Sequence, residues 1–90
     1  MITTETVIDE LIELKHGYEN LSLGVLKSQN EHQELIIIIH GLTVICSIDL
    51  TGETAKMIDC SKGYTNEWES EYLTIVEQYL KHHFVKFNRL

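Results

Sequence analysis

A chain of 90 residues that is 43% hydrophobic and 23% charged is too apolar to stay disordered and too short for two cores, so we expect one domain over residues 1–90. Fourteen acidic residues oppose seven lysines and arginines, and the net charge of −7 disfavours direct binding to nucleic acid. The longest apolar run, Leu35 to Ile39, is far shorter than the about 20 residues that cross a bilayer. The N-terminus lacks the basic start and apolar core of a signal peptide, so we expect a cytoplasmic protein with reduced thiols and no membrane association.

The first segment with a regular pattern runs from about Thr4 to His16. Its apolar residues recur at helical spacing and form one stripe, made of Val7, Ile8, Leu11, Ile12 and Leu14. Either Thr3 or Thr4 can cap its start, and acidic residues follow where the helix dipole favours anions. The pattern predicts an amphipathic helix.

Three or four strands are expected next, separated by polar or glycine-containing turns. Their predicted ranges are Leu21–Ser28, Glu34–His40, Leu42–Leu50 and Ala55–Ser61. The second range holds four consecutive isoleucines, which indicates a strand covered on both faces. In the first range, Gly24 marks a bulge or a close contact. The third range alternates in polarity, so we expect one face to carry Leu42, Val44, Cys46, Ile48 and Leu50.

Two registers are open for the third and fourth strands. A two-residue turn that begins with Gly52 would place Ile45 opposite Cys60. An odd-length loop would place Cys46 opposite Cys60 and gather the apolar residues on one face. We expect the second register, and therefore that the two cysteines are near neighbours. Both lie among isoleucines, where cysteine is a small buried hydrophobe rather than a reactive thiol.

The C-terminal segment predicts a second helix. Asn66 with Glu69 fits a capping box, although Thr65 is an alternative cap. We expect this helix to reach at least Phe84 and to extend as far as Asn88, a length of roughly 30 Å. The residues at helical spacing are Trp68, Tyr72, Ile75, Val76, Tyr79, Leu80, His83, Phe84 and Phe87.

The predicted fold is α+β, with a three- to four-stranded antiparallel sheet flanked by an N-terminal and a C-terminal helix, in the order α-β-β-β-(β)-α. Two helices on one face would leave the other face bare, with Ile45 and Met57 on it. Either the helices cover opposite faces, or a second copy or a partner covers the bare one, so a homodimer is possible. Phe84 and Phe87, projecting beyond the sheet, are the other candidate dimer contact.

Patterns that would support catalysis or metal binding are incomplete. Glu13 and His16 lie one turn apart, but a di-iron helix pair needs a second Glu-x-x-His and the chain has none. His82 and His83 point to different sides of a helix, and the cysteines lack zinc-site spacing. No phosphate-binding loop or nucleophile motif occurs. We therefore expect a non-enzymatic protein with no metal and no cofactor.

Two acidic segments lie near the ends of the chain. Met1 to Leu14 and Tyr64 to Gln78 each hold four acidic residues and no lysine or arginine. If the two helices pack side by side, these residues form one anionic surface suited to a basic, nucleic-acid-handling protein. The expected partner-binding residues are the acids Asp9, Glu10, Glu13, Glu67, Glu69 and Glu71, with Tyr18, Tyr64 and Trp68 as aromatic anchors.

In size, acidity and order of elements, the chain resembles the small phage-encoded inhibitors of host defence, among them anti-CRISPR proteins. The segments MITTETVIDELIEL and TNEWESEYLTIVEQ, which flank the isoleucine-rich strands, carry this resemblance. Such inhibitors share no common fold, so the resemblance implies no particular residues. It implies a stoichiometric inhibitor in the host cytoplasm that occupies a basic groove for DNA or RNA. The alternative is a small structural or regulatory homodimer without nucleic-acid mimicry.

Overall fold

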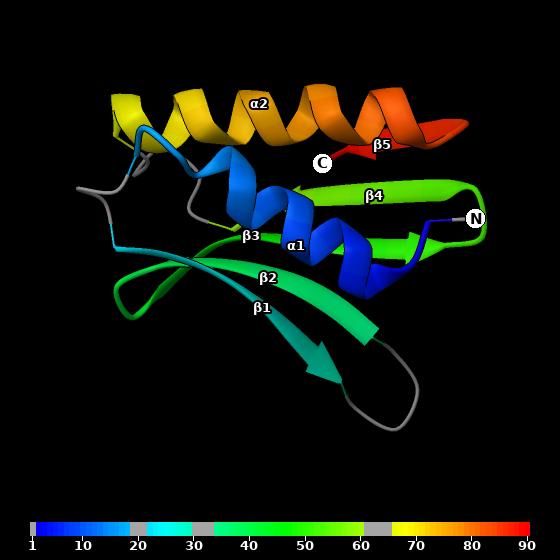
Figure 1. Cartoon of the computed structure of the whole chain (residues 1–90), viewed down its shortest axis with the longest axis horizontal. Helices are drawn as coiled ribbons and strands as arrows, with labels where there is room; N and C mark the ends of the chain where they lie inside the picture. Colours follow the sequence, from blue (N-terminus) through cyan, green and yellow to red (C-terminus); the bar gives the residue numbers. More distant parts are fainter. Residues whose placement is uncertain (1, 19–21, 30–33, 61–65) are drawn as a thin grey trace.

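The computed structural model describes residues 2–18, 22–29, 34–60 and 66–90 and has the predicted α+β class. Two helices and five strands follow one another along the chain (Figure 1). They are α1 (Thr4–Leu14), β1 (Leu23–Gln29), β2 (Glu34–His40), β3 (Thr43–Thr51), β4 (Thr54–Asp59), α2 (Glu67–His83) and β5 (Lys86–Arg89).

The sheet has the strand order β1-β2-β3-β4-β5. The first four strands form an antiparallel meander, as predicted, and β5 adds a fifth strand parallel to β4. The sheet is therefore mixed and not purely antiparallel. Parallel neighbours need a crossover connection, and α2 provides it between β4 and β5.

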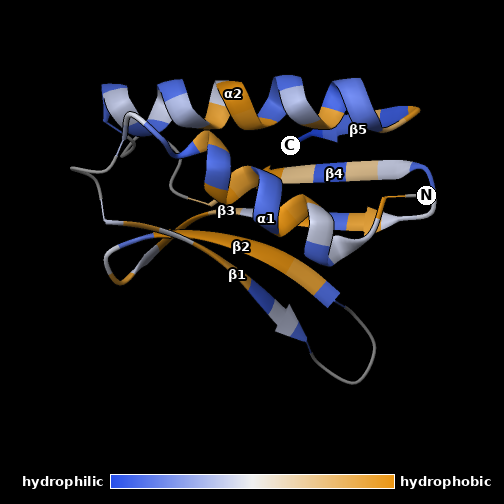
Figure 2. Ribbon diagram, viewed as in Figure 1, coloured by the Kyte–Doolittle hydropathy of each residue, from blue (hydrophilic) through white to orange (hydrophobic). Residues whose placement is uncertain are grey.

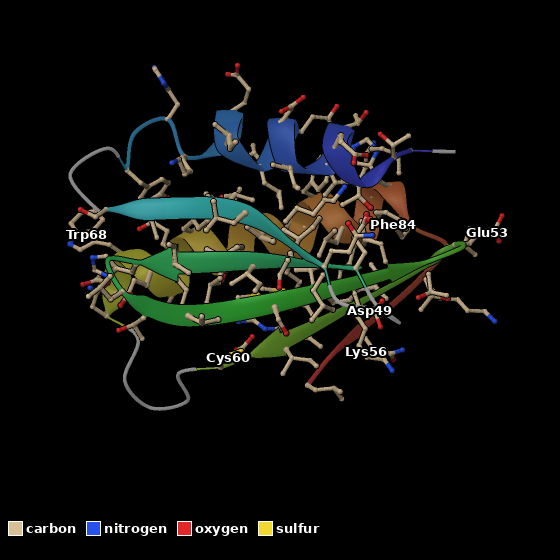
Figure 3. The ribbon with its side chains drawn as sticks, turned by 90° about the horizontal axis from the view of Figure 1, so that it is seen from below. Asp49, Glu53, Lys56, Cys60, Trp68 and Phe84 are labelled. Carbon is tan, nitrogen blue, oxygen red and sulfur yellow. The ribbon has the colours of Figure 1, made fainter. Side chains whose placement is uncertain are left out.

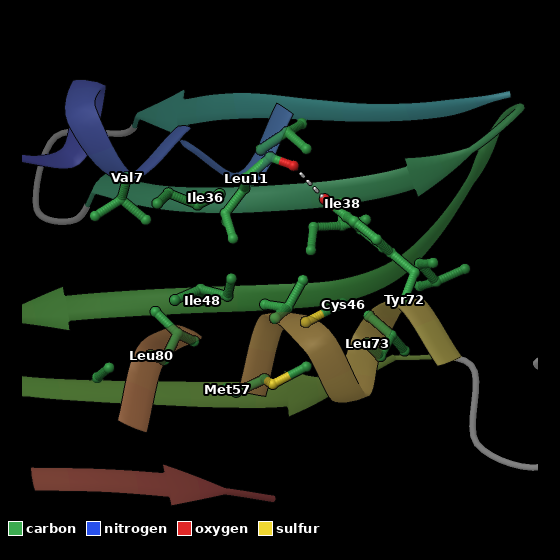
Figure 4. Close-up of a cluster of buried hydrophobic side chains, with 14 of the residues drawn as sticks. Val7, Leu11, Ile36, Ile38, Cys46, Ile48, Met57, Tyr72, Leu73 and Leu80 are labelled. Carbon is green, nitrogen blue, oxygen red and sulfur yellow. Dashed lines mark hydrogen bonds between the residues drawn. The ribbon is translucent and has the colours of Figure 1, made fainter. Parts of the chain in front are cut away.

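Both helices contribute to one core on one face of the sheet (Figure 4). From the helices, the core contains Val7, Leu11, Tyr72, Leu73, Val76 and Leu80, and from β2, β3 and β4 it contains Ile36, Ile38, Ile45, Cys46, Ile48, Ala55 and Met57. The buried Tyr72 hydroxyl donates to the Leu11 carbonyl at 2.8 Å, one of the last-turn carbonyls of α1 that need a partner. Ile45 and Met57, expected on the bare face, instead belong to this core.

Neither α1 nor α2 lies over the opposite face of the sheet (Figure 3), so the alternative with one of these helices on each face is wrong. In Figure 3, seen from below, the strands lie in front of α2. Gly24 and Ile39 pair in the ladder on this face, and a Cβ at Gly24 would lie 3.0 Å from Ile39 Cγ1. The close contact predicted at this glycine is thus confirmed.

The register of β3 and β4 is the one that the sequence analysis set aside. The hairpin has a two-residue turn that begins with Gly52, whose φ is +60°. Cys46 pairs with Asp59, and the Cys60 N–H donates to the Ile45 carbonyl. Glycine adopts positive φ without steric cost, and the buried Ile48 and Met57 pair directly in this register, so the turn preference and apolar burial agree.

A β-bulge in β3 explains why two consecutive residues, Ile45 and Cys46, are both buried. The pairing of β2 with β3 shifts between Ile38 and Ile39, and Ile45 is the extra residue. Ile45 is buried, whereas Val44 and Leu42, expected on the same face as the core residues, are exposed. Simple alternation fails here because a bulge turns one additional side chain inward.

Helix α2 ends at His83, and the chain then forms β5 instead of continuing as helix to Asn88. Phe84 is extended (φ −121°, ψ 138°) and buried, so it does not project as a dimer contact. The Leu90 N–H donates to the Met57 carbonyl at 2.8 Å and continues the ladder. The spacing of Phe84 and Phe87 fits a helix, but Phe87 packs against the core from a strand.

Arg89 links β5 to β4 and α2. Its guanidinium donates to both carboxylate oxygens of Asp59, at 3.1 and 2.8 Å, and to Glu77 on α2 at 3.1 Å. A bidentate arginine–carboxylate contact of this kind fixes the relative orientation of the two groups as well as their distance. It joins the ends of β4 and β5 to the middle of α2.

The start of α2 is closed by the predicted capping box, with Asn66 as the cap. The Asn66 side chain accepts from the Glu69 N–H at 2.8 Å, and the Asn66 N–H donates to Glu69 Oε1 at 2.7 Å. Glu69 Oε2 lies 2.7 Å from Nδ1 of His40, at the end of β2. Glu69 is only 5% exposed, so one carboxylate closes the helix and ties it to the sheet.

The environments of the two free cysteines predict different reactivity. Burial, and then the nearby Asp59, raise the pKa of the Cys46 thiol to about 12, whereas Cys60 is exposed. Because the thiolate is the reactive form, iodoacetamide at neutral pH should label Cys60 alone in the folded protein and both cysteines in denaturant. Mass spectrometry of the labelled peptides checks this. Labelling of Cys46 in the folded protein would contradict the burial of this thiol in the core.

Removing the Glu69 carboxylate should destabilise the fold, because it leaves the Asn66 N–H and His40 without their acceptor. We expect Glu69→Ala to lower the free energy of unfolding by about 1–3 kcal/mol, measured by urea denaturation. Glu67→Ala, two positions away on the exposed side of α2, is the matched control and should change it by less than about 0.5 kcal/mol. Equal effects of the two substitutions would show that Glu69 is not a structural carboxylate.

Candidate binding surface

The two helices lie side by side on the sheet, so the two acidic segments of the sequence meet in one layer (Figure 1). Hydrogen bonds from three tyrosine hydroxyls connect the two halves of this layer. In addition to the bond from Tyr72 to α1, the Tyr79 hydroxyl on α2 donates to Glu10 Oε2. The Tyr18 hydroxyl, just after α1, donates to Glu71 Oε1 at 2.8 Å. The acidic side chains therefore come from two helices that are fixed relative to each other.

On α1, Asp9 and Glu13 are exposed and lie one turn apart. Carboxylates at positions i and i+4 of a helix repel each other. Glu13 also lies in the last turn of α1, which contains no basic residue, and anions are disfavoured at that end of the helix dipole. Neither position is explained by the stability of the helix.

On α2, Glu67 and Glu71 are exposed and repeat the same spacing. Glu67 gains from its place in the first turn, where the dipole favours an anion. Glu71 is held by Tyr18, and this hydrogen bond raises the pKa of the tyrosine. Tyr18 in turn lies against Tyr72, with ring centroids 5.9 Å apart, so Glu71 is positioned by a side chain that contacts the core.

Glu10 lies between the helices and is partly buried. Burial of Tyr79, followed by its hydrogen bond to Glu10, raises the pKa of that tyrosine. Helical spacing places Tyr79 on the apolar stripe of α2. Its hydroxyl reaches past the stripe to a carboxylate, and helical spacing gives no signal of such a contact.

The remaining predicted site residues lie in three different settings. Glu69 is buried in the helix cap described above and does not belong to the exposed surface. Trp68 is 55% exposed and lies at the start of α2, at the end of the molecule (Figure 3). Tyr18 is partly buried, with its hydroxyl on Glu71. Tyr64 lies outside the described residues.

Four other acidic residues of the described structure have a lysine or arginine partner. Lys27 lies 2.8 Å from Glu5 and 3.5 Å from Glu34, and Arg89 holds Asp59 and Glu77. Within the described ranges, no lysine or arginine makes such a bridge to the remaining acids of the helix layer, which are Asp9, Glu10, Glu13, Glu67 and Glu71. We call these five residues the acidic helix surface.

Two further observations bear on other functions. Over the part of the chain that the structure describes, no three His, Cys, Asp or Glu side chains gather as a metal site would require. Neither α1 nor α2, the helices among the described residues, has the length and apolar composition needed to cross a membrane. The absence of enzymatic activity stays a prediction.

Comparison with known proteins gives no relative on which to base a function. No family model, no curated protein and no solved structure matches the chain. The function is therefore inferred from the acidic helix surface and from the sheet alone.

Proposed function

We propose that this protein is a non-enzymatic, acidic binding protein that acts as a stoichiometric inhibitor, occupying a basic nucleic-acid-binding surface of a partner protein. The observation that carries the proposal is the acidic helix surface. Its five carboxylates lie on two adjacent helices and have no lysine or arginine bridged to them among the described residues. A basic partner would supply the missing counter-charges.

The cost of this arrangement to the free protein supports the proposal. The Asp9–Glu13 and Glu67–Glu71 pairs are each destabilising by a few tenths of a kcal/mol, and Glu13 opposes the helix dipole as well. Positions at which local preferences are violated without a structural gain are expected at functional sites. Contact with a cationic surface would offset these repulsions, because each carboxylate would then have an opposite charge beside it.

Preorganisation supports the proposal in a second way. Glu10 and Glu71 are already held by tyrosine hydroxyls, so less side-chain freedom is lost when they meet a partner. One accepted hydrogen bond does not exhaust a carboxylate, which has about four lone-pair positions. Each of the two can therefore receive a lysine or arginine while the tyrosine stays in place.

Trp68 and Tyr18 supply aromatic surface close to the acids of α2. Trp68 lies one turn before Glu71, and Tyr18 is bonded to that carboxylate. Exposed aromatic side chains beside charged ones are typical of the residues that dominate binding energy at protein interfaces. The proposed contact thus combines charge, which speeds encounter, with apolar area, which slows dissociation.

The resemblance to phage-encoded inhibitors of host defence leads to the same kind of partner, a protein with a groove for DNA or RNA. Both the anti-CRISPR-type role and the identity of the partner stay predictions. If the proposal holds, association is fast at low salt and weakens as salt rises, because screening shortens the reach of the charges to about 3 Å at 1 M.

Charge reversal on the acidic helix surface should abolish binding and leave the fold intact. We expect the triple variant Asp9→Lys, Glu13→Lys, Glu67→Lys to capture no basic nucleic-acid-binding protein from nuclease-treated lysate, whereas the unchanged protein captures one that high salt releases. The pair at positions 9 and 13 stays like-charged in this variant, Glu13→Lys suits the dipole of α1, and Glu67→Lys opposes that of α2, so the free energy of unfolding should change by less than about 1 kcal/mol. Captured proteins are identified by mass spectrometry, and folding is checked by urea denaturation.

A matched pair of single variants separates position from net charge. Glu13→Lys and Glu53→Lys change the net charge equally, but Glu53 lies in the exposed turn between β3 and β4 (Figure 3). The first should weaken capture by roughly tenfold, as expected for loss of a central charge contact, and the second should leave it near the original level. Equal losses from both, or capture that the triple variant retains, would contradict the proposal.

A further inference from the structure

The face of the sheet opposite the helices presents a largely apolar surface, interrupted by Ser47 in its central row. Strand registers place Leu26, Ile37, Ser47 and Ile58 in one row across β1 to β4, and Leu90 continues this row beside Ile58. Leu26 is 52%, Ile58 37% and Leu90 60% exposed. A neighbouring row adds Ile39 and Val44. Figure 2 shows β2 coloured as hydrophobic along most of its length, as expected for a strand that needs cover on both faces. We call this surface the open sheet face.

The row beside the apolar one carries two opposite charges. Asp49 and Lys56 pair across β3 and β4 and lie next to each other in Figure 3. With Thr51 and Thr54 they line a hollow of about 290 Å³ on this face. The row contains one negative and one positive charge. When a second copy of the row faces it in reversed order, each charge therefore meets the opposite charge.

The distribution of acidic residues decides which face a second copy can approach. Among the described strand residues, Asp49 is the one acid directed to the open sheet face, since Glu34 and Asp59 lie on the helix side. Two helix layers would meet with like charges opposed, which costs several kcal/mol at an interface. The open sheet face combines apolar area, few acids and a self-complementary row.

The geometry points to a homodimer formed by the open sheet faces of two copies, related by a two-fold axis parallel to the strands between β3 and β4. This axis places Asp49 of each copy against Lys56 of the other. It also places Leu90 of each copy over Ile37 of the other. Two sheets packed face to face with their strands about 30° apart form a standard sandwich, and a two-fold axis closes it.

The dimer is independent of the proposed function and compatible with it. The helix layers would lie on the two outer sides, so each dimer would present two acidic helix surfaces. The dimer would also give the second face of the sheet the cover that a small domain of this size lacks. Its failure would leave the acidic helix surface unaffected, because the tests below change no residue of that surface.

The first test measures the mass of the full chain in solution by analytical ultracentrifugation over a range of concentrations, at low and high salt. We expect a dimer at low micromolar concentration whose stability changes little with salt, since apolar area dominates the contact. Ile58→Lys should raise the dissociation constant at least about tenfold. Ile12→Lys, on the exposed side of α1 at 43% exposure, introduces the same charge and should leave the dimer unchanged.

The second test uses charge exchange within the row. Asp49→Lys and Lys56→Asp should each weaken self-association about tenfold or more, because like charges then face each other across the axis. Mixing the two variants should restore dimers. In a dimer that contains one copy of each variant, both charge pairs across the axis again have opposite signs. Circular dichroism and urea denaturation verify that each variant is folded, and the recovery on mixing excludes misfolding as the cause of the single losses.

A chain that stays monomeric at all concentrations would overturn the dimer, whether or not some other protein covers the open sheet face. Equal effects of Ile58→Lys and Ile12→Lys would place the interface elsewhere. Open-ended oligomers would also contradict it, because a two-fold contact uses the same surface on both copies and stops at two. Dimers that form but do not recover on mixing the charge variants would reject the proposed axis.

Discussion

The crossover of α2 between two parallel strands is the constraint on which the rest of the structure depends. The link from β4 through α2 to β5 puts this helix over the same face of the sheet that α1 covers. The buried hydrogen bond from Tyr72 to the carbonyl of Leu11 then sets how the two helices meet. Because both helices occupy one face, the acids of both ends of the chain come together, and the other face of the sheet stays bare.

These two consequences divide the surface of a small protein into parts with different chemistry. The helix layer carries carboxylates, some of them held by tyrosines, and the open sheet face carries apolar side chains with one acid among the described strand residues. In a chain with a net charge of −7, gathering carboxylates on one side adds electrostatic repulsion to the folded state. A separate binding role for each side would account for this arrangement. Charge on one side favours a basic partner, and apolar area on the other favours a second copy.

Much of the fold could be predicted from periodicity and from local signals. The helix beginning at Thr4, the isoleucine-rich strand over Glu34–His40 and the capping box of Asn66 each follow from patterns within a few residues. The failures involve competition between local and long-range preferences. Apolar pairs occur in either register of β3 and β4, so the turn at Gly52 decided between them. Phe84 and Phe87 fit a helix, although the chain turns there to pair with β4.

The candidate site could be predicted in its charge but not in its detail. The acids Asp9, Glu13, Glu67 and Glu71 are visible in the sequence because neither acidic segment contains a lysine or arginine. The capping box marked Glu69 as a helix-cap residue, but its burial also depends on His40 at the end of a distant strand, which the sequence does not show. Nor could it show the hydrogen bond of Tyr79 to Glu10, or that Asp49 and Lys56 share a row, because a shift of one residue in register would have parted them.

We propose that the layout of the acids on α1 and α2, and not the net charge alone, attracts a cationic partner. Residue-resolved NMR titration with a short polyarginine peptide distinguishes the two. We expect chemical-shift changes to concentrate at Asp9, Glu13, Glu67 and Glu71, with little change at Glu53 in the β3–β4 turn. Changes of similar size at all exposed acids, or changes centred on the strands, would contradict it.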